Sequence, residues 1–224
     1  MIIAIDGPAG SGKSTTAKAV ARLLGFRHLD SGAFYRAITY AALQSNLDPQ
    51  QWDQLTPAAL DGLGIDARPA KNGFRLFWSG ADLTDAIRLP AVNAHVSQMA
   101  RVPAVRQWLF GHLRAAARDG DLVADGRDMG TVVFPDAHLK VFLTADPAER
   151  AKRRLLEQGV AAPTKSQVEA EKTRLTTRDR IDSDRAVSPL RAAEDAVRLD
   201  TTGLSFEEQV DAIVTLARAR QAAG

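Results

Sequence analysis

Several features common in other classes of protein are missing from this 224-residue sequence, beginning with cysteine. The absence of cysteine excludes disulfides, thiolate metal sites and a cysteine nucleophile. No apolar run reaches the roughly 18 residues that a membrane-spanning helix needs. The first residues carry neither the basic segment nor the apolar stretch of a signal peptide. We therefore expect a cytoplasmic protein with no membrane association.

A strong charge of one sign is also missing. Lys and Arg total 29 against 27 Asp and Glu, so the formal net charge is +2 at pH 7. No run of like charges forms a tail for a polyanion, and we expect no nucleic-acid partner. The chain has no internal repeat or long linker. With 45% hydrophobic and 25% charged residues, it fits a single globular domain with room for small excursions.

The clearest motif lies at the start of the chain. Residues 2–5 are an apolar run too short for a helix, which predicts a strand buried on both faces. Residues 7–14 read Gly-Pro-Ala-Gly-Ser-Gly-Lys-Ser, the G-x-x-x-x-G-K-S pattern of a phosphate-binding loop. An amphipathic helix over residues 17–24 follows. A chance glycine-rich turn would lack this context, so the sequence predicts nucleoside triphosphate binding.

Each part of this loop has a physical task. The glycines let backbone N–H groups surround an anion, and the helix start adds the positive end of its dipole. Lys13 supplies an ammonium for the β- and γ-phosphates, and the Ser14 hydroxyl is placed to bind Mg²⁺. Asp125, at the end of a later buried strand, is expected to hold a water of that ion. Asp30 is the rival carboxylate at the same sheet edge.

Strand-like and helix-like segments alternate along the rest of the chain. Further strands are predicted at residues 26–29, 121–125, 138–144 and 196–200, and helices at 33–44, from 146 onward and near the end of the chain. This alternation is typical of an α/β fold, a five-stranded parallel sheet with helices on both faces. Ligands of such sheets lie at the carboxyl ends of the strands.

Residues 46–90 interrupt the alternation. Asn72-Gly73 is a strong hairpin-turn signal between residues 65–71 and 74–79, and a short third strand fits residues 81–84. We interpret this segment as a small antiparallel insert. Residues 91–118 then predict helix interrupted at Pro103, with Gly120 as its C-terminal cap.

Arginine is concentrated in the last third of the chain. The helix predicted from Asp146 carries Arg150, Arg153 and Arg154, and a second charged helix ends over residues 174–185. Alternating charge of this kind usually forms a solvated face. Arginines flanking a phosphate loop are also the means of clamping anionic substrates. The sequence leaves both interpretations open.

Three segments beyond the loop carry a resemblance to a known family. Residues 30–36 read DSGAFYR, residues 125–135 read DGRDMGTVVFP and residues 178–189 read RDRIDSDRAVSP. Together with the phosphate loop they resemble bacterial cytidylate kinase, a P-loop nucleoside monophosphate kinase, from about residue 2 to 218. The resemblance implies transfer of the γ-phosphoryl group of ATP to CMP or dCMP. It divides the single domain into a core (1–45, 91–150 and 190–224), a monophosphate-binding insert (about 46–90) and a helical lid (about 151–189).

The resemblance also implies roles for individual residues. The ATP site would comprise Gly7, Pro8, Ala9, Gly10, Ser11, Gly12, Lys13, Ser14, Thr15 and Arg150. The CMP site would comprise Ser31, Tyr35, Arg36, Ser97, Arg106, Arg127, Asp128, Arg178, Asp182 and Arg185. Within it Ser97, Arg106 and Asp128 would read the cytosine, and Asp182 and Arg185 would reach the sugar. The catalytic set would be Lys13, Arg127, Arg154 and Arg178, with Arg153 able to replace either lid arginine, Arg150 or Arg154.

Other functions use the same loop. A uridylate, deoxynucleoside or shikimate kinase differs in its acceptor, and a nucleotide-gated switch would hydrolyse slowly and present a partner surface. The arginines favour the enzyme, because phosphoryl transfer depends on positioning and charge neutralisation. We expect ATP and CMP or dCMP as small-molecule partners, Mg²⁺ as the cofactor, and a monomer.

Overall fold

The computed structural model describes residues 1–71, 73–118 and 120–223, and the chain divides into two compact units. The phosphate-loop unit combines Met1–Phe26 with Asp121–Gly224. The middle unit is Arg27–Gly120. Gly224, the last residue of the predicted core, lies outside the described residues. Two segments far apart in the sequence therefore fold together around the first strand.

Strand β1 (Ile2–Asp6) is at the centre of the phosphate-loop unit. It pairs in parallel with β6 (Leu122–Gly126) on one side and with β7 (Leu139–Thr144) on the other. The edge strand β8 (Val197–Asp200) pairs in parallel with β7. With β2 (Arg27–Asp30), the sheet has five strands in the order β2-β6-β1-β7-β8. The predicted α/β fold is confirmed, and the apolar run of β1 is buried as a central parallel strand requires.

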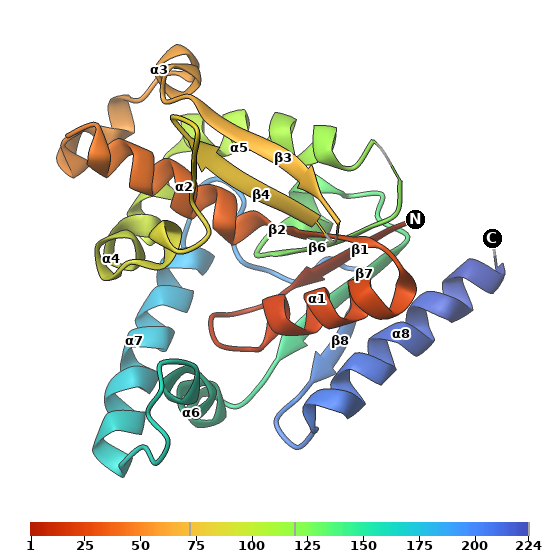
Figure 1. Cartoon of the computed structure of the whole chain (residues 1–224). Helices are drawn as coiled ribbons and strands as arrows, with labels where there is room; N and C mark the ends of the chain where they lie inside the picture. Colours follow the sequence, from red (N-terminus) through yellow and green to blue (C-terminus); the bar gives the residue numbers. More distant parts are fainter. Residues whose placement is uncertain (72, 119, 224) are drawn as a thin grey trace. The chain divides into compact units, whose positions relative to one another are not determined.

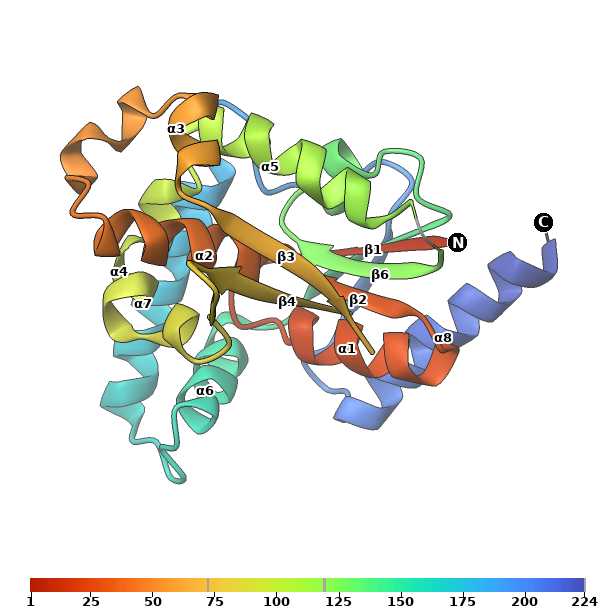
Figure 2. The ribbon, with the colours of Figure 1, turned by 45° about the horizontal axis from the view of Figure 1, so that its top comes forward.

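Two helices of this unit pack on the sheet side by side. Figures 1 and 2 show α1 (Lys13–Leu24) next to α8 (Phe206–Ala223), against the strands. Their apolar faces join Ile3, Ile5 and Val141 in one buried cluster. Helix α1 ends at Leu24 and is capped by Gly25, whose left-handed conformation (φ 72°) lets its N–H reach back to the carbonyls of the last turn. The core of the unit thus includes residues of β1 and α1, the two elements that the phosphate loop connects.

Three more helical segments belong to the phosphate-loop unit. They are α6 (Pro147–Glu157), α7 (Lys165–Ser183) and the short π-helical turn η3 (Met129–Val133). Asp146 caps α6 as predicted, since its side chain accepts the N–H groups of Ala148 and Glu149. Helices α6 and α7 pack against each other around a small apolar cluster that includes Ala9 of the phosphate loop.

In its described residues the middle unit contains six helical segments, a hairpin and a short third strand. In chain order its helical segments and strands after β2 are α2 (Ser31–Gln44), η1 (Pro49–Gln54), α3 (Pro57–Gly62), β3 (Ile65–Ala70), β4 (Gly73–Trp78), β5 (Ala81–Asp82), η2 (Ala86–Arg88), α4 (Pro90–Met99) and α5 (Pro103–Ala116). Strands β3, β4 and β5 form an antiparallel sheet, as predicted. Asn72, the first residue of the predicted turn, lies outside the described residues.

The structure of this unit differs from the sequence-based prediction in two respects. Gly120 was predicted to cap the helix that ends near residue 118, but α5 ends at Ala116 and its cap is Ala117 in a right-handed conformation. This prediction is wrong, because an ordinary residue in that conformation already ends the helix. The short helices η1 and α3 were not predicted, although Thr56 before Pro57 is an N-terminal capping signal.

Helix boundaries elsewhere follow the caps. Helix α2 begins at Ser31, two residues before the predicted start, because the Asp30 side chain accepts the Ala33 N–H at 3.0 Å. None of the helices in the described part of the chain has the length and apolar character needed to cross a membrane.

Candidate active site

The phosphate loop connects β1 to α1, and its shape depends on glycine. Gly12 is the residue before α1 and has a left-handed conformation (φ 84°) that other residues rarely adopt. A Cβ atom on Gly7 would lie 2.1 Å from the Leu143 carbonyl oxygen, so the loop passes too close to β7 for any side chain there. The Lys13 Nζ donates to the Pro8 carbonyl at 2.7 Å, across the loop. The Lys13 side chain therefore folds back over the loop and contacts its main chain.

The surroundings of Lys13 disfavour the charged form of its side chain. Burial, followed by the nearby positive charge of Arg127, lowers the pKa of its ammonium from 10.5 to about 7, although Asp125 and Asp179 oppose the shift. A buried cation next to other cations is stabilised by an anion. The arrangement of Lys13 among arginines fits a site that receives phosphate groups.

Ser14 and Asp125 form a pair of oxygen donors beside the loop. The Ser14 hydroxyl donates to Asp125 Oδ2 at 2.5 Å, and Asp125 itself is buried at the end of β6. Within the described residues, no three His, Asp or Glu side chains converge as a metal site would require. Mg²⁺ commonly takes only one or two protein oxygens and fills its remaining positions with water and substrate phosphates. This hydroxyl–carboxylate pair has the right chemistry for that ion.

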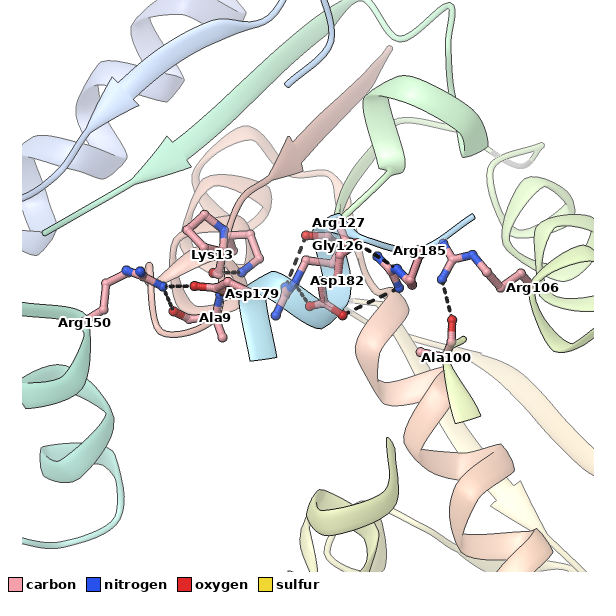
Figure 3. A network of polar contacts seen from close by, with 11 residues as sticks. Ala9, Lys13, Ala100, Arg106, Gly126, Arg127, Arg150, Asp179, Asp182 and Arg185 are labelled. Carbon is pink, nitrogen blue, oxygen red and sulfur yellow. Dashed lines mark hydrogen bonds and ion pairs between the residues drawn. The ribbon is translucent and has the colours of Figure 1, made fainter. Parts of the chain in front are cut away.

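Three charged side chains join α7 to the end of β6. Arg127 Nε donates to Asp182 Oδ2 at 2.9 Å, and Arg185 Nη1 lies 3.7 Å from Asp182 Oδ1 (Figure 3). Burial raises the pKa of Asp182, but the positive charges of Arg127, Arg185 and Arg178 outweigh it and hold the pKa below its ordinary value. Asp182 therefore stays ionised and fixes two arginines that were predicted in the CMP site.

A second ion pair holds the phosphate loop from outside. Arg150 on α6 donates through Nη1 to the Ala9 carbonyl at 2.8 Å and also to Asp179 on α7. Asp179 in turn accepts the Ala9 N–H at 2.8 Å (Figure 3). Both polar groups of the Ala9 main chain are thus satisfied by the two helices. Of the neighbouring arginines, Arg154 pairs with Glu157, and Arg153 contacts Glu149 and Thr201.

The middle unit gathers other predicted residues. Arg106 on α5 is 1% exposed, donates to the Ala100 carbonyl at 3.0 Å and lies 5.4 Å from the centre of the Tyr35 ring. Arg36 on α2 lies at hydrogen-bond distance from Asn93, 3.5 Å. Ser31 is the first residue of α2, and Ser97 is half-buried on α4. A buried guanidinium against an aromatic ring is unusual for a helix surface, and it marks this part of the unit as a candidate binding site.

Asp128 is buried where η3 begins. It is 2% exposed and directly precedes the first residue of the π-helical turn.

The two carboxylates considered for the metal have different partners. Asp30 caps α2 through the Ala33 N–H, whereas Asp125 accepts the hydroxyl of Ser14. Thr15 is exposed on the first turn of α1.

Three residues near the loop were not predicted. Asp6, the last residue of β1, accepts two backbone N–H groups of η3. Asp179 contacts Ala9, and Gln209 of α8 donates to Thr16, whose hydroxyl donates to the Gly12 carbonyl at 2.8 Å. In the sequence Asp179 is one of many charges and Gln209 one of many polar helix residues. Of these three residues, only Asp6 stands out in the sequence, because it is a charged residue that follows a run of four apolar residues.

Comparison with known proteins adds a family to this geometry. A sequence profile for the family described as cytidylate kinase matches residues 3–219. The cytidylate kinase of Desulfitobacterium hafniense is 49% identical over 215 residues, which cover 96% of this chain and 91% of that protein. The bifunctional pantoate ligase/cytidylate kinase of Synechococcus elongatus is 49% identical over 228 residues, 98% of this chain but only 42% of that protein. The chain thus spans about two fifths of the length of such bifunctional relatives.

A solved structure supports the fold alone. The crystal structure of an uncharacterized protein from Eubacterium ventriosum aligns over 98% of both chains with a TM-score of 0.51 and 14% sequence identity.

Proposed function

Because this chain belongs to the cytidylate kinase family, we propose that it transfers the γ-phosphoryl group of ATP to CMP or dCMP, giving ADP and CDP or dCDP. The observation that carries the proposal is the surroundings of Lys13. A phosphate loop with a buried lysine shares one compact unit with two arginines, Arg127 and Arg185, that a single carboxylate holds in place. Such a unit can neutralise two phosphorylated substrates together.

The donor half of the site is the loop itself. We assign the ATP phosphates to the backbone N–H groups of residues 7–15, the start of α1 and the Lys13 ammonium. Ser14 would hold Mg²⁺ directly and Asp125 would hold one of its waters, and the ion would draw charge from the phosphate oxygens. Lys13 contacts the charge that develops on the transferring group, so its effect falls mainly on turnover.

The acceptor half uses arginine and carboxylate. We assign the monophosphate to Arg127 and Arg178, with Ser31, Tyr35 and Arg36 around it, and the sugar to Asp182 and Arg185. Ser97, Arg106 and Asp128 would read the base. An acceptor phosphate is already ionised near pH 7, so its oxygen attacks the γ-phosphorus without a general base. The bond from that phosphorus to the bridging oxygen breaks, and ADP leaves with the electron pair.

We assign closure of the site to the two segments inserted between parts of the core. We propose that residues of about 46–90 form the monophosphate-binding insert and residues of about 151–189 a lid. On the lid side, Arg150 would face the adenine and Arg154 the transferring phosphates, with Arg153 as an alternative for either role. A closed lid excludes water, which would otherwise compete as the acceptor. We further propose that the protein acts as a monomer in the cytoplasm.

One experiment separates this function from its rivals. ADP release is measured with ATP and Mg²⁺ against CMP, dCMP, UMP, AMP and shikimate, and without any acceptor. We expect CMP and dCMP to give the highest kcat/KM. Fast turnover with shikimate alone or with UMP alone would show that this compound, and not CMP or dCMP, is the phosphate acceptor. Slow ADP release that no acceptor accelerates would indicate a nucleotide-gated switch instead.

A further inference from the structure

The carboxylate of Asp6 connects the phosphate-loop strand to a second segment of the same unit. Asp6 ends β1 and directly precedes Gly7. It is 4% exposed, and its two oxygens accept the backbone N–H groups of Met129 at 2.8 Å and of Gly130 at 2.7 Å. One buried side chain therefore holds two consecutive peptide groups that lie more than a hundred residues away in the sequence.

The peptides that Asp6 holds come directly after Arg127 and Asp128. They open η3, in which the Asp128 carbonyl accepts the N–H groups of Val132 and Val133 at 2.9 and 3.1 Å. The first N–H groups of any helix lack acceptors within that helix. Asp6 supplies acceptors for the first two of these groups, those of Met129 and Gly130, so the entry into η3 is fixed from β1. A π-helical turn is rare in proteins and is found frequently at functional sites.

We propose that Asp6 is a positioning residue for acceptor selection, which sets the placement of Arg127 and Asp128 by holding the Met129 and Gly130 peptides. The inference rests on the proposed function, because Asp128 selects a base only if the acceptor is a cytidine nucleotide. Asp6 acts in this scheme through two main-chain groups and not by contact with substrate. The donor loop and the acceptor-reading segment are then set from the same residue of β1.

Two other roles for Asp6 make different predictions. A purely structural residue would lower stability and reduce the efficiency of both substrates together. A residue that acts through its charge on Lys13, with which it interacts electrostatically, would change ATP binding first. A positioning residue for the 127–130 segment changes the CMP parameters and the choice of base, and it leaves the KM for ATP nearly unchanged.

Two substitutions at Asp6 and one at its partner test the proposal. Asp6→Asn keeps the volume and one acceptor oxygen but turns an amide donor toward a peptide N–H, and Asp6→Ala removes both acceptors. Gly130→Ala keeps the Asp6 charge, but its Cβ would lie 3.4 Å from Asp6 Oδ2 and 3.2 Å from Lys140 carbons, which displaces the peptide slightly. This third variant therefore separates geometry from charge.

We expect the KM for CMP to rise by about tenfold in Asp6→Asn, by more in Asp6→Ala and by a few-fold in Gly130→Ala, with the KM for ATP within about twofold of wild type. The ratio of kcat/KM for CMP to that for UMP should fall in the same order. Asp200→Asn is the matched control, since Asp200 also accepts a backbone N–H, from Thr202 at 2.9 Å, but at the exposed end of β8. Ile213→Val, in the buried core of the same unit, controls for lost stability without a change at this segment.

The possible results are distinct. If the wild type forms ADP with CMP but the three variants change the KM for ATP and CMP equally, or leave the CMP-to-UMP ratio at the wild-type value, the Asp6 inference alone is overturned. If the wild type shows no CMP-dependent ADP formation, the proposed function fails and the inference fails with it. Should Asp6→Ala not fold, Asp6→Asn and Gly130→Ala decide the question.

Discussion

The guanidinium of Arg150 on α6 and the carboxylate of Asp179 on α7 form an ion pair, and each also contacts the main chain of Ala9. The two side chains are 7% and 16% exposed, so the pair is largely removed from water. Loss of one partner leaves the other charge poorly compensated, which costs more than loss of an exposed pair. Helices α6 and α7 and the phosphate loop should therefore respond together to a change at either residue.

Arg150→Ala and Asp179→Ala are each expected to raise the KM for ATP by roughly tenfold and to lower the free energy of unfolding by about 2 kcal/mol. The control is Arg180→Ala, whose side chain is 83% exposed and pairs with the exposed Asp184, the residue that follows α7. Steady-state kinetics and urea unfolding give both quantities. If Arg180→Ala and Asp179→Ala changed the KM for ATP and the free energy of unfolding equally, the contact with Ala9 would have no role in ATP binding.

Lys13→Ala is expected to lower kcat by about two to three orders of magnitude, because one donor at developing charge contributes about 3–4 kcal/mol to the barrier. Lys18→Ala, exposed on the same helix, should leave kcat unchanged. Circular dichroism verifies that both variants are folded. A folded Lys13→Ala that retains more than about a tenth of the wild-type kcat contradicts the role given to Lys13.

Asp125→Asn is expected to raise the Mg²⁺ concentration that gives half-maximal activity, and Ser14→Ala to raise it further. The reason is that Ser14 and Asp125 lie within hydrogen-bond distance of each other beside the loop. Asp30→Asn is the comparison, because Asp30 caps α2 through the Ala33 N–H. Titration of Mg²⁺ at fixed ATP distinguishes them. An unchanged metal requirement in Asp125→Asn would remove Asp125 from the metal assignment.

Asp128→Asn is expected to lower kcat/KM for CMP by about one to two orders of magnitude, on the order of 1.5–3 kcal/mol for a hydrogen bond to a charged group. Cytosine offers an amino donor at N4, and an ionised Asp can only accept. An amide can instead turn its NH₂ toward O4 of uracil, so UMP should lose much less. The measurement is the CMP-to-UMP ratio, and a ratio equal to that of wild type would leave Asp128 with a structural role only.

The pH dependence of stability should show opposite slopes from two neighbouring groups. Burial raises the pKa of Asp6 from 3.8 to about 7. The folded state then binds this proton more readily between those values, and the free energy of unfolding falls as pH rises through that window. Burial and Arg127 lower the pKa of Lys13 from 10.5 to about 7, so between those values the unfolded chain binds the proton more readily and stability rises with pH.

Urea unfolding between pH 4 and 10 measures both slopes. Asp6→Asn should remove the decline on the acid side, and Lys13→Met the rise on the alkaline side. The comparison is made as the difference from wild type at each pH, which cancels the contribution of other groups. Parallel curves for wild type and variant would show that the residue does not titrate differently in the folded state.

Much of the fold follows from local sequence signals. The run of four apolar residues before Asp6 predicts a buried parallel strand, as observed. The predicted hairpin is confirmed by the pairing of β3 with β4, but Gly73 begins β4 and pairs with Ala70, so it lies in the strand and not in the turn. The short helices η1, α3 and η2 of the middle unit were missed because none of the three is long enough to show a periodic apolar face. The cap at Gly120 was misplaced because a glycine after a helix is a frequent end signal but not a required one.

The site was less predictable, because its supports are distant in sequence. The motif identifies Lys13 and Ser14, but nothing local indicates that Asp179 holds Ala9 from 170 residues away. On α7 the exposed Arg180 and the buried Asp182 have the same appearance in a charged helix. Only the packing of the helix decides which charges face the protein and which face water.

The position of β1 between β6 and β7 also affects how the chain is made. During synthesis the first strand emerges with its apolar residues unpaired, and its nearest partner begins at Leu122. At synthesis rates of about 5–20 residues per second, this interval lasts roughly ten seconds. The nascent strand presents free backbone edges throughout that time, which makes it a segment for ribosome-associated chaperones to shield.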